Sequence, residues 1–358
     1  MTKIDRYISR RFFYFLLLAT LASMAIFLVV DPIENLDKFL DRDVPTKDIL
    51  RYYALFVPYI IYLIYPVAVL LATMFCIGGL TVTNELMAMT ASGVPLYRHL
   101  LLLAFIGLML SGFMFWWGET IVPQTNRERL AIWREQVKQR KDWRLTEQGQ
   151  VYLQDGPGRV LHLDLYQPRT KTGYGIDLYQ FTTDGRVVER IAARSLMWEG
   201  GQWMLHDAIL RKFTPEGERA EIHDLLQIKL QVVPDDMVEL KVEPEEMSME
   251  ELQRFTERIE NTGGNPDRWR VDIHSKIALP FAGFIIVLFG VPVSAVRRRS
   301  GVIFGVALSL IISFIYFGIM QVGKVLGYKE ILSPWFAAWL GNIIFFMIGV
   351  ILYRRTPR

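Results

Sequence analysis

Hydrophobic residues gather in six segments of membrane length, three before and three after a long polar insert. The first segment, Phe12–Val30, carries no charged side chain. At roughly 1.5 Å per helical residue it is long enough to cross a hydrocarbon core of about 30 Å. Five further segments have similar length and composition: Ala54–Leu80, Leu100–Val122, Ile277–Val296, Val302–Val322 and Pro334–Tyr353. The pattern predicts an α-helical membrane protein with six transmembrane helices, arranged three plus three around an inserted domain.

Positively charged residues near the segment ends predict how the chain is oriented. They form three clusters, one before the first segment, one between the fourth and fifth, and one after the sixth: Lys3, Arg6, Arg10 and Arg11; Arg297, Arg298 and Arg299; Arg354, Arg355 and Arg358. Six crossings place all three clusters on one face, and Lys and Arg favour the cytoplasmic face. We therefore expect both termini in the cytoplasm and the insert outside it. The expected domains are 1–122, 123–270 and 271–358.

The insert begins with a polar, helix-compatible stretch and then changes to short alternating runs. Val160–Leu163 is typical of these runs, which have the period-two pattern of half-buried strands and are separated by Gly, Pro and Asp. Regular short strands favour an all-β sandwich or roll over about residues 143–240. After it, Ser248 and Glu251 form a capping-box pattern that predicts a flanking helix.

Composition adds three constraints. The mean hydropathy of +0.24 is only mildly high because the polar insert dilutes the membrane signal. The orientation in the membrane accounts for the basic residues, so the net charge of +3 does not indicate a nucleic-acid partner. The single cysteine, Cys76, lies in the second apolar segment and cannot form an internal disulfide. The outer domain is therefore expected to rely on its own hydrophobic core.

No catalytic pattern stands out in the insert. His162, His206 and His223 lack the spacing of metal ligands, and each lies in a strand-like or polar run. The sequence has no nucleophile elbow, no zinc motif and no phosphate-binding loop with Gly, four residues and Gly-Lys-Ser/Thr. We therefore expect a non-catalytic chain that holds no metal and does not hydrolyse ATP itself.

Residues 84–95, between the second and third apolar segments, are suited to a short helix on the cytoplasmic face. Glu85 stands near the start of this helix, Leu86 and Met89 are compatible with it, and Gly93 ends it. One interpretation is a helix that inserts into a groove of a soluble partner. The other is a capped helix that only connects two membrane spans.

Five motifs, in order along the chain, resemble the lipopolysaccharide-export permeases of the LptF/LptG type. They are Ile4–Ile8, Glu85–Val94, Met247–Leu252, His274–Ala282 with its continuation to Phe289–Pro292, and Pro334–Asn342. Each motif is modest alone, but five in the same order are specific. The resemblance covers essentially the whole chain, including the order of spans and insert.

The resemblance implies a heterodimer of two paralogous six-span permeases with a cytoplasmic ATPase dimer in the bacterial inner membrane. Such a complex extracts lipopolysaccharide from the outer leaflet and passes it to a periplasmic β-jellyroll bridge protein. The insert would then be a periplasmic β-jellyroll-like domain whose apolar interior takes acyl chains. Residues 84–95 would be the coupling helix that docks on the ATPase, through Glu85, Leu86, Met89 and Gly93. The partner ATPase would use ATP and Mg, and this chain would bind no cofactor.

Lipopolysaccharide has an anionic, phosphorylated headgroup, so its path is expected to carry cations near the outer ends of the spans. Four residues are candidates: Lys38, Arg42, Lys276 and Lys324. They would pair with lipid phosphates through charge-assisted contacts, or simply extend toward the interface. In place of further lysines of the family pattern, this chain has Asp31, Glu34 and Asp37. These acids would bind divalent cations or face water.

Two other classes of function provide alternatives. A membrane-anchored enzyme acting on envelope lipids would need clustered acid, base or metal-ligating residues near the outer interface, and the sequence shows none. A mechanotransmitting scaffold permease usually has four spans with its large domain after the first, a layout that this chain lacks. The sequence does not distinguish which of the two paralogous permeases the chain is.

Overall fold

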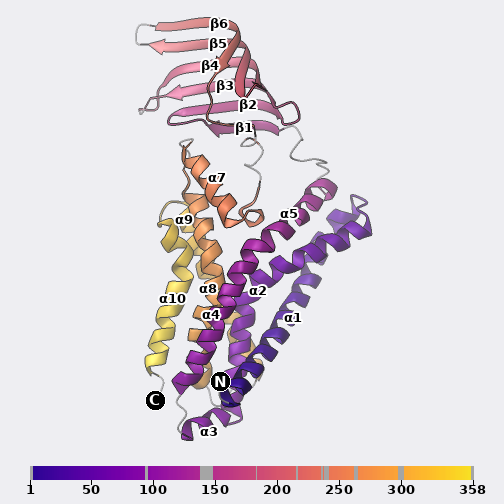
Figure 1. Ribbon diagram of the computed structural model, residues 1–358, viewed down its shortest axis with the longest axis vertical. Helices are drawn as coiled ribbons and strands as arrows, with labels where there is room; N and C mark the ends of the chain where they lie inside the picture. Colours follow the sequence, from indigo (N-terminus) through magenta and orange to yellow (C-terminus); the bar gives the residue numbers. More distant parts are fainter. Residues whose placement is uncertain are drawn as a thin grey trace. The chain divides into compact units, whose positions relative to one another are not determined.

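The computed structural model describes residues 3–92, 96–137, 148–182, 184–214, 217–234, 237, 242–261, 265–296 and 302–355. The chain forms two compact units (Figure 1). The helical unit comprises Met1–Leu130 and Asp267–Arg358, and the inserted unit comprises Ala131–Pro266. One unit thus lies within the sequence of the other.

The helical unit contains the membrane spans. Its helices are α1 (Lys3–Leu40), α2 (Thr46–Val82), α3 (Glu85–Ala91), α4 (Leu96–Thr120), α5 (Val122–Ile132), α8 (Asp267–Val296), α9 (Val302–Tyr328) and α10 (Pro334–Arg355), of which α5 continues into the inserted unit. Within the described ranges, six helices are long and apolar enough to cross a membrane, namely α1, α2, α4, α8, α9 and α10. The predicted arrangement of three plus three spans is confirmed.

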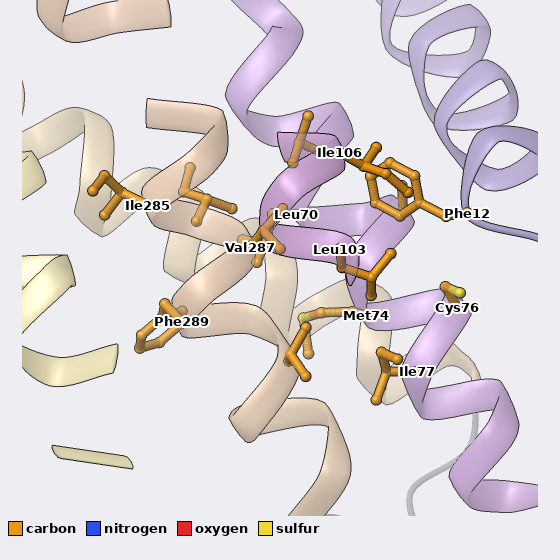
Figure 2. Packing of buried hydrophobic residues seen from close by; sticks show 14 of the residues in the cluster. Phe12, Leu70, Met74, Cys76, Ile77, Leu103, Ile106, Ile285, Val287 and Phe289 are labelled. Carbon is orange, nitrogen blue, oxygen red and sulfur yellow. The ribbon is translucent and has the colours of Figure 1, made fainter. Parts of the chain in front are cut away.

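Helices α2 and α8 form the centre of the helical unit, whereas α1 lies at its margin. About 72% of the apolar stretch of α2 and 67% of that of α8 are buried, but only 6% of that of α1. Leu70 and Met74 of α2 belong to the same buried cluster as Leu103 of α4 and Val287 of α8 (Figure 2). Most of the apolar surface of α1 is therefore exposed at the surface of the helical unit.

A buried amide joins three of the spans. Asn342 of α10 is 1% exposed, and its Nδ2 donates to the carbonyl oxygen of Ala278 in α8 at 2.8 Å. The hydroxyl of Tyr316 in α9 donates to Asn342 Oδ1, also at 2.8 Å. Such side-chain hydrogen bonds hold membrane helices together where water offers no alternative partner.

The inserted unit contains one antiparallel sheet. Its elements are η1 (Trp133–Val137), β1 (Gln148–Gln154), β2 (Arg159–Gln167), β3 (Thr172–Phe181), β4 (Val187–Glu199), β5 (Gln202–Thr214), β6 (Gly217–Ile228), η2 (Pro244–Glu246) and α7 (Met249–Asn261). The strands are paired in the order β1-β2-β3-β4-β5-β6, so each strand pairs with its neighbours in the chain. The expected β domain between the third and fourth spans is confirmed, and its described strands form a meander.

The capping box predicted before α7 is present. Ser248 N donates to Glu251 Oε2 at 2.8 Å, and Glu251 N donates to Ser248 Oγ at 3.2 Å. Two donors at the start of the helix are thereby satisfied reciprocally. Leu252 and Phe255 are buried on one side of the helix, as their spacing predicts.

Residues 229–234, which follow β6 and are called the return segment below, pack against the apolar face of the sheet through Leu230 and Val232. Val232 is 1% exposed and packs into the core of the sheet. Trp203 Nε1 of β5 donates to Val232 O at 2.7 Å. The Asp155 carboxylate, after β1, accepts hydrogen bonds from Gln231 N at 2.6 Å and Val232 N at 3.1 Å. The segment is thus attached to the sheet at several points.

Candidate functional site

Helix α3 is attached to the helical unit by one face and exposed on the other. Leu86 is 7% exposed and belongs to the buried core, and Met89 packs against that core. Met87, Ala88 and Thr90 are exposed. Of the residues expected to dock on a partner, Leu86 and Met89 therefore anchor the helix to its own chain.

The Glu85 carboxylate makes its hydrogen bonds within the chain. It accepts from the Thr83 hydroxyl at 2.7 Å and the Tyr7 hydroxyl at 2.8 Å, and it lies 3.4 Å from Arg11 Nη1. The hydrogen bonds from Thr83 and Tyr7, together with the positive charge of Arg11, lower the pKa of Glu85 from its ordinary value. The ionised carboxylate links α3 to α1. Gly93, the fourth expected docking residue, lies outside the described residues.

An apolar cavity of about 710 Å³ lies between α1, α2, α8 and α9. Its wall includes Phe15 and Leu18 of α1, Met74 of α2 and Leu308 of α9. A largely hydrocarbon lining of this kind suits an apolar ligand. Arg11 of α1 also lines the cavity. The Arg11 side chain therefore contacts Glu85 of α3 and also forms part of the cavity wall.

Two of the expected headgroup-binding cations are paired with carboxylates. Lys276 Nζ lies 3.6 Å from Glu119 Oε1, with both side chains largely buried. Lys324 Nζ lies 3.2 Å from Asp272 Oδ1, which also accepts a hydrogen bond from the Tyr328 hydroxyl at 2.5 Å. A lipid phosphate would have to compete with these carboxylates for either ammonium group.

The other two expected cations lie near the end of α1 and are exposed. Lys38 Nζ donates to Asn35 Oδ1 at 2.6 Å, one helical turn earlier. Arg42 follows the last residue of α1 by two positions. A hydrogen bond to a neutral amide is weaker than one to a carboxylate. Both side chains are exposed, whereas those of Lys276 and Lys324 are largely buried.

A further cation, Arg129 of α5, was not among the residues selected from the sequence. It is 8% exposed, and its Cζ lies 4.1 Å from the ring centroid of Phe56. The rings of Tyr52 and Tyr59 lie at 5.6 Å on the same guanidinium. Cation–π attraction at a desolvated site is worth about 2 kcal/mol. The three aromatic residues are spaced four and three positions apart, so they lie on one face of α2. This spacing is the feature of the sequence that could have indicated an aromatic site for a cation.

Six membrane-length helices, with a folded β domain between the third and fourth, define a multi-pass membrane protein. A family model described as "Lipopolysaccharide export system permease LptF/LptG" matches residues 6–355. The chain belongs to this LptF/LptG permease family.

Curated relatives include both kinds of permease in this family. The lipopolysaccharide export system permease protein LptG of Escherichia coli (strain K12) is 21% identical over 360 residues, covering 98% of each chain. The corresponding LptF protein of the same strain is 22% identical over 319 residues, covering 87% of this chain and 84% of the relative. LptF of Shigella flexneri is similar to the same extent. The two identities are nearly equal, so they do not assign the chain to either kind.

Proposed function

We propose that this chain is one of two paired permeases of an ATP-driven lipopolysaccharide exporter in the bacterial inner membrane. The observation that carries the proposal is the continuous family match from residue 6 to residue 355, which includes every span, α3 and the inserted domain. In this proposal the chain is a non-catalytic subunit and binds no cofactor. A separate cytoplasmic ATPase dimer uses ATP and Mg.

The proposed orientation places both termini and α3 in the cytoplasm and the inserted unit in the periplasm. Within the helical unit, α1 begins and α10 ends at the same end as α3 (Figure 1). That end carries Lys3, Arg6, Arg10 and Arg354. Lys and Arg beside membrane spans favour the cytoplasmic face, which supports this orientation.

The proposed docking surface for the ATPase is the exposed face of α3. An amphipathic helix commonly binds in a groove of a partner through side chains on one face. In α3 this face carries Met87, Ala88 and Thr90. Leu86 and Met89 fix the helix to the core, so a push on the exposed face would be transmitted to the spans.

The proposed lipid path uses apolar surfaces in both units. Acyl chains would occupy the apolar surface that α1 and α9 present to the second, paralogous permease. The cavity between α1, α2, α8 and α9 lies toward the α3 end of the helices, the proposed cytoplasmic side. Phosphates would pair first with the exposed Lys38 and Arg42, and with Lys276 and Lys324 after their acids release them. The apolar face of the β domain would then receive the acyl chains and pass them to a β-jellyroll bridge protein.

Reconstitution tests the proposal directly. The chain is co-expressed with a paralogous permease and the ATPase, purified as a complex and placed in vesicles containing lipopolysaccharide. We expect the ATPase to co-purify and lipopolysaccharide to reach a soluble β-jellyroll acceptor only when ATP is supplied. A complex with an ATPase unable to hydrolyse ATP is the control. A purified chain that never retains an ATPase, or a complex that transfers no lipid, would refute the proposal.

A further inference from the structure

Arg11 contacts Glu85 at the start of α3 and also lines the apolar cavity. Its Nη1 atom lies 3.4 Å from Glu85 Oε1 and donates to the Tyr7 hydroxyl at 3.0 Å, so one side of the guanidinium belongs to the attachment of α3. The same residue lines the apolar cavity. Its side chain is only 22% exposed. A displacement of Glu85 would therefore move a group that forms part of the cavity wall.

Gly79 of α2 provides the space that the guanidinium occupies. A Cβ atom at position 79 would lie 2.5 Å from Arg11 Nη2, too close for the present arrangement. A Cβ atom at the neighbouring Gly78 would meet nothing within 4 Å. The long Arg11 side chain would move away at little cost, because its far end is the part in contact. The position of the guanidinium thus depends on the absence of a side chain at residue 79.

The contacts also show how a movement of α3 would reach Arg11. Glu85 is the first residue of α3 and Leu86 is the second, so the anchored face and the charged contact lie within one helical turn. Arg11 is connected to Glu85 in two ways, by the 3.4 Å contact and through the Tyr7 hydroxyl, which accepts from Arg11 at 3.0 Å and donates to Glu85 at 2.8 Å. A movement of α3 would therefore carry the Arg11 side chain with it.

We propose that Arg11 is a positioning residue that transmits movement of α3 to the wall of the apolar cavity between α1, α2, α8 and α9. The proposal rests on the function proposed above for two points: the ATPase moves α3, and the packing of α1 against α2, α8 and α9 changes during lipid transfer. It adds the element that connects them. Arg11 belongs to α1 and not to the exposed face of α3, so we expect its loss to separate ATP hydrolysis from lipid movement.

The test uses the complete complex with its ATPase and paralogous permease in vesicles. Three quantities are measured: ATPase association, the rate of ATP hydrolysis, and lipopolysaccharide transferred per ATP hydrolysed. We expect Arg11→Gln and Gly79→Ala to lower the transfer per ATP by about fivefold or more, the size of a typical coupling between sites. Hydrolysis should stay close to the wild-type rate, because the exposed face of α3 is unchanged.

Gly78→Ala is the matched comparison for Gly79→Ala. Both add one methyl group to the same helix and remove the same glycine flexibility, but only Gly79→Ala displaces Arg11. Both glycines line the cavity, so each variant adds a methyl group at its wall, and the difference between the two variants measures the displacement of Arg11. If Arg11→Gln fails to assemble, Gly79→Ala still decides the question, since it leaves every charged group in place. Equal transfer per ATP in both glycine variants would overturn the proposal.

Charge exchange provides a rescue. The double variant Arg11→Glu with Glu85→Arg restores an opposite-charge pair, so we expect it to recover transfer per ATP relative to either single change. A double variant no better than the worse single change would count against a direct contact between these residues. The wild-type complex separates this proposal from the proposed function. If the wild type moves no lipid, the function fails; if it does and every variant matches it, only the role of Arg11 fails.

Discussion

At the scale of single residues, the ionised state of Glu85 is the condition for its contacts. Its folded-state pKa is lowered, mainly by hydrogen bonds from Thr83 and Tyr7. The ionised carboxylate therefore stabilises the folded state above the ordinary pKa of 4.5, and this stabilisation is lost as the pH falls through the lowered folded-state pKa. The side chain is 34% exposed, so water screens part of the effect.

The prediction for Glu85 compares melting temperatures of the wild type and Glu85→Gln in nanodiscs. We expect the variant to melt lower at neutral pH, and the difference to shrink as the pH falls below 4.5, the ordinary pKa of the group, and through its lowered pKa in the folded state. Glu34→Gln, an exposed change on α1, is the control and should show a small difference at all pH values. A Glu85 difference that is independent of pH would show that the carboxylate charge does not matter.

At the scale of elements, the two faces of α3 are expected to respond differently to truncation. Leu86→Ala removes buried methyl groups and should lower the free energy of unfolding by about 2–3 kcal/mol. Met87→Ala changes an exposed side chain and should leave the melting temperature nearly unchanged. In the complex, however, Met87→Ala should weaken ATPase binding about tenfold, the equivalent of about 1.4 kcal/mol. Equal ATPase affinity in Met87→Ala and wild type would place the docking surface elsewhere.

The return segment gives a second prediction at this scale. Asp155→Ala removes the acceptor of the Gln231 and Val232 amides. Burial raises the pKa of Asp155, so desolvation of its charge offsets part of these hydrogen bonds, and we expect a net loss of about 1–2 kcal/mol. Hydrogen exchange should accelerate at residues 231 and 232 but not in the strands. Asp184→Ala, an exposed change between β3 and β4, should change neither the free energy of unfolding nor the hydrogen exchange at residues 231 and 232. Unchanged exchange in Asp155→Ala would mean that other contacts hold the segment.

At the scale of the whole molecule, the proposed topology can be measured with single cysteines. Cys76 is the single cysteine of the sequence, so Cys76→Ala gives a cysteine-free background. Ser92→Cys and Asp184→Cys then place one thiol after α3 and one in the β domain. In intact inner-membrane spheroplasts, a membrane-impermeant maleimide should label Cys introduced at 184 and spare the one at 92. Inside-out vesicles should give the reverse. Labelling of both positions from the same side would refute the topology.

The sequence predicts the parts of this fold whose signals are local. Six apolar runs suffice for six spans, because each has to satisfy its own backbone within a membrane. Alternation and turn residues suffice for the strands, and two residues suffice for the capping box at Ser248 and Glu251. The order of the strands in the sheet follows from their short connections.

Contacts between distant segments are not predictable from such patterns. Two motifs contain Ala278 and Asn342, but only the packed helices show that these residues are hydrogen bonded. The same holds for Lys276, whose ion pair with Glu119 depends on how α4 and α8 pack. Arg129 has a local signal only in its partners, the aromatic residues on one face of α2. The sequence of a single chain carries patterns of composition and spacing but does not show which distant residues are in contact.

The return segment would compete with an acyl chain for the apolar face of the β domain. Val232 already occupies the apolar face that the proposed lipid path requires. An acyl chain entering there would have to exchange with this segment, and its apparent affinity falls in proportion to the fraction of domains that are open. Under the proposed function, lipid would be retained only when it arrives at high local concentration, and chance encounters with dilute amphiphiles would leave the face closed.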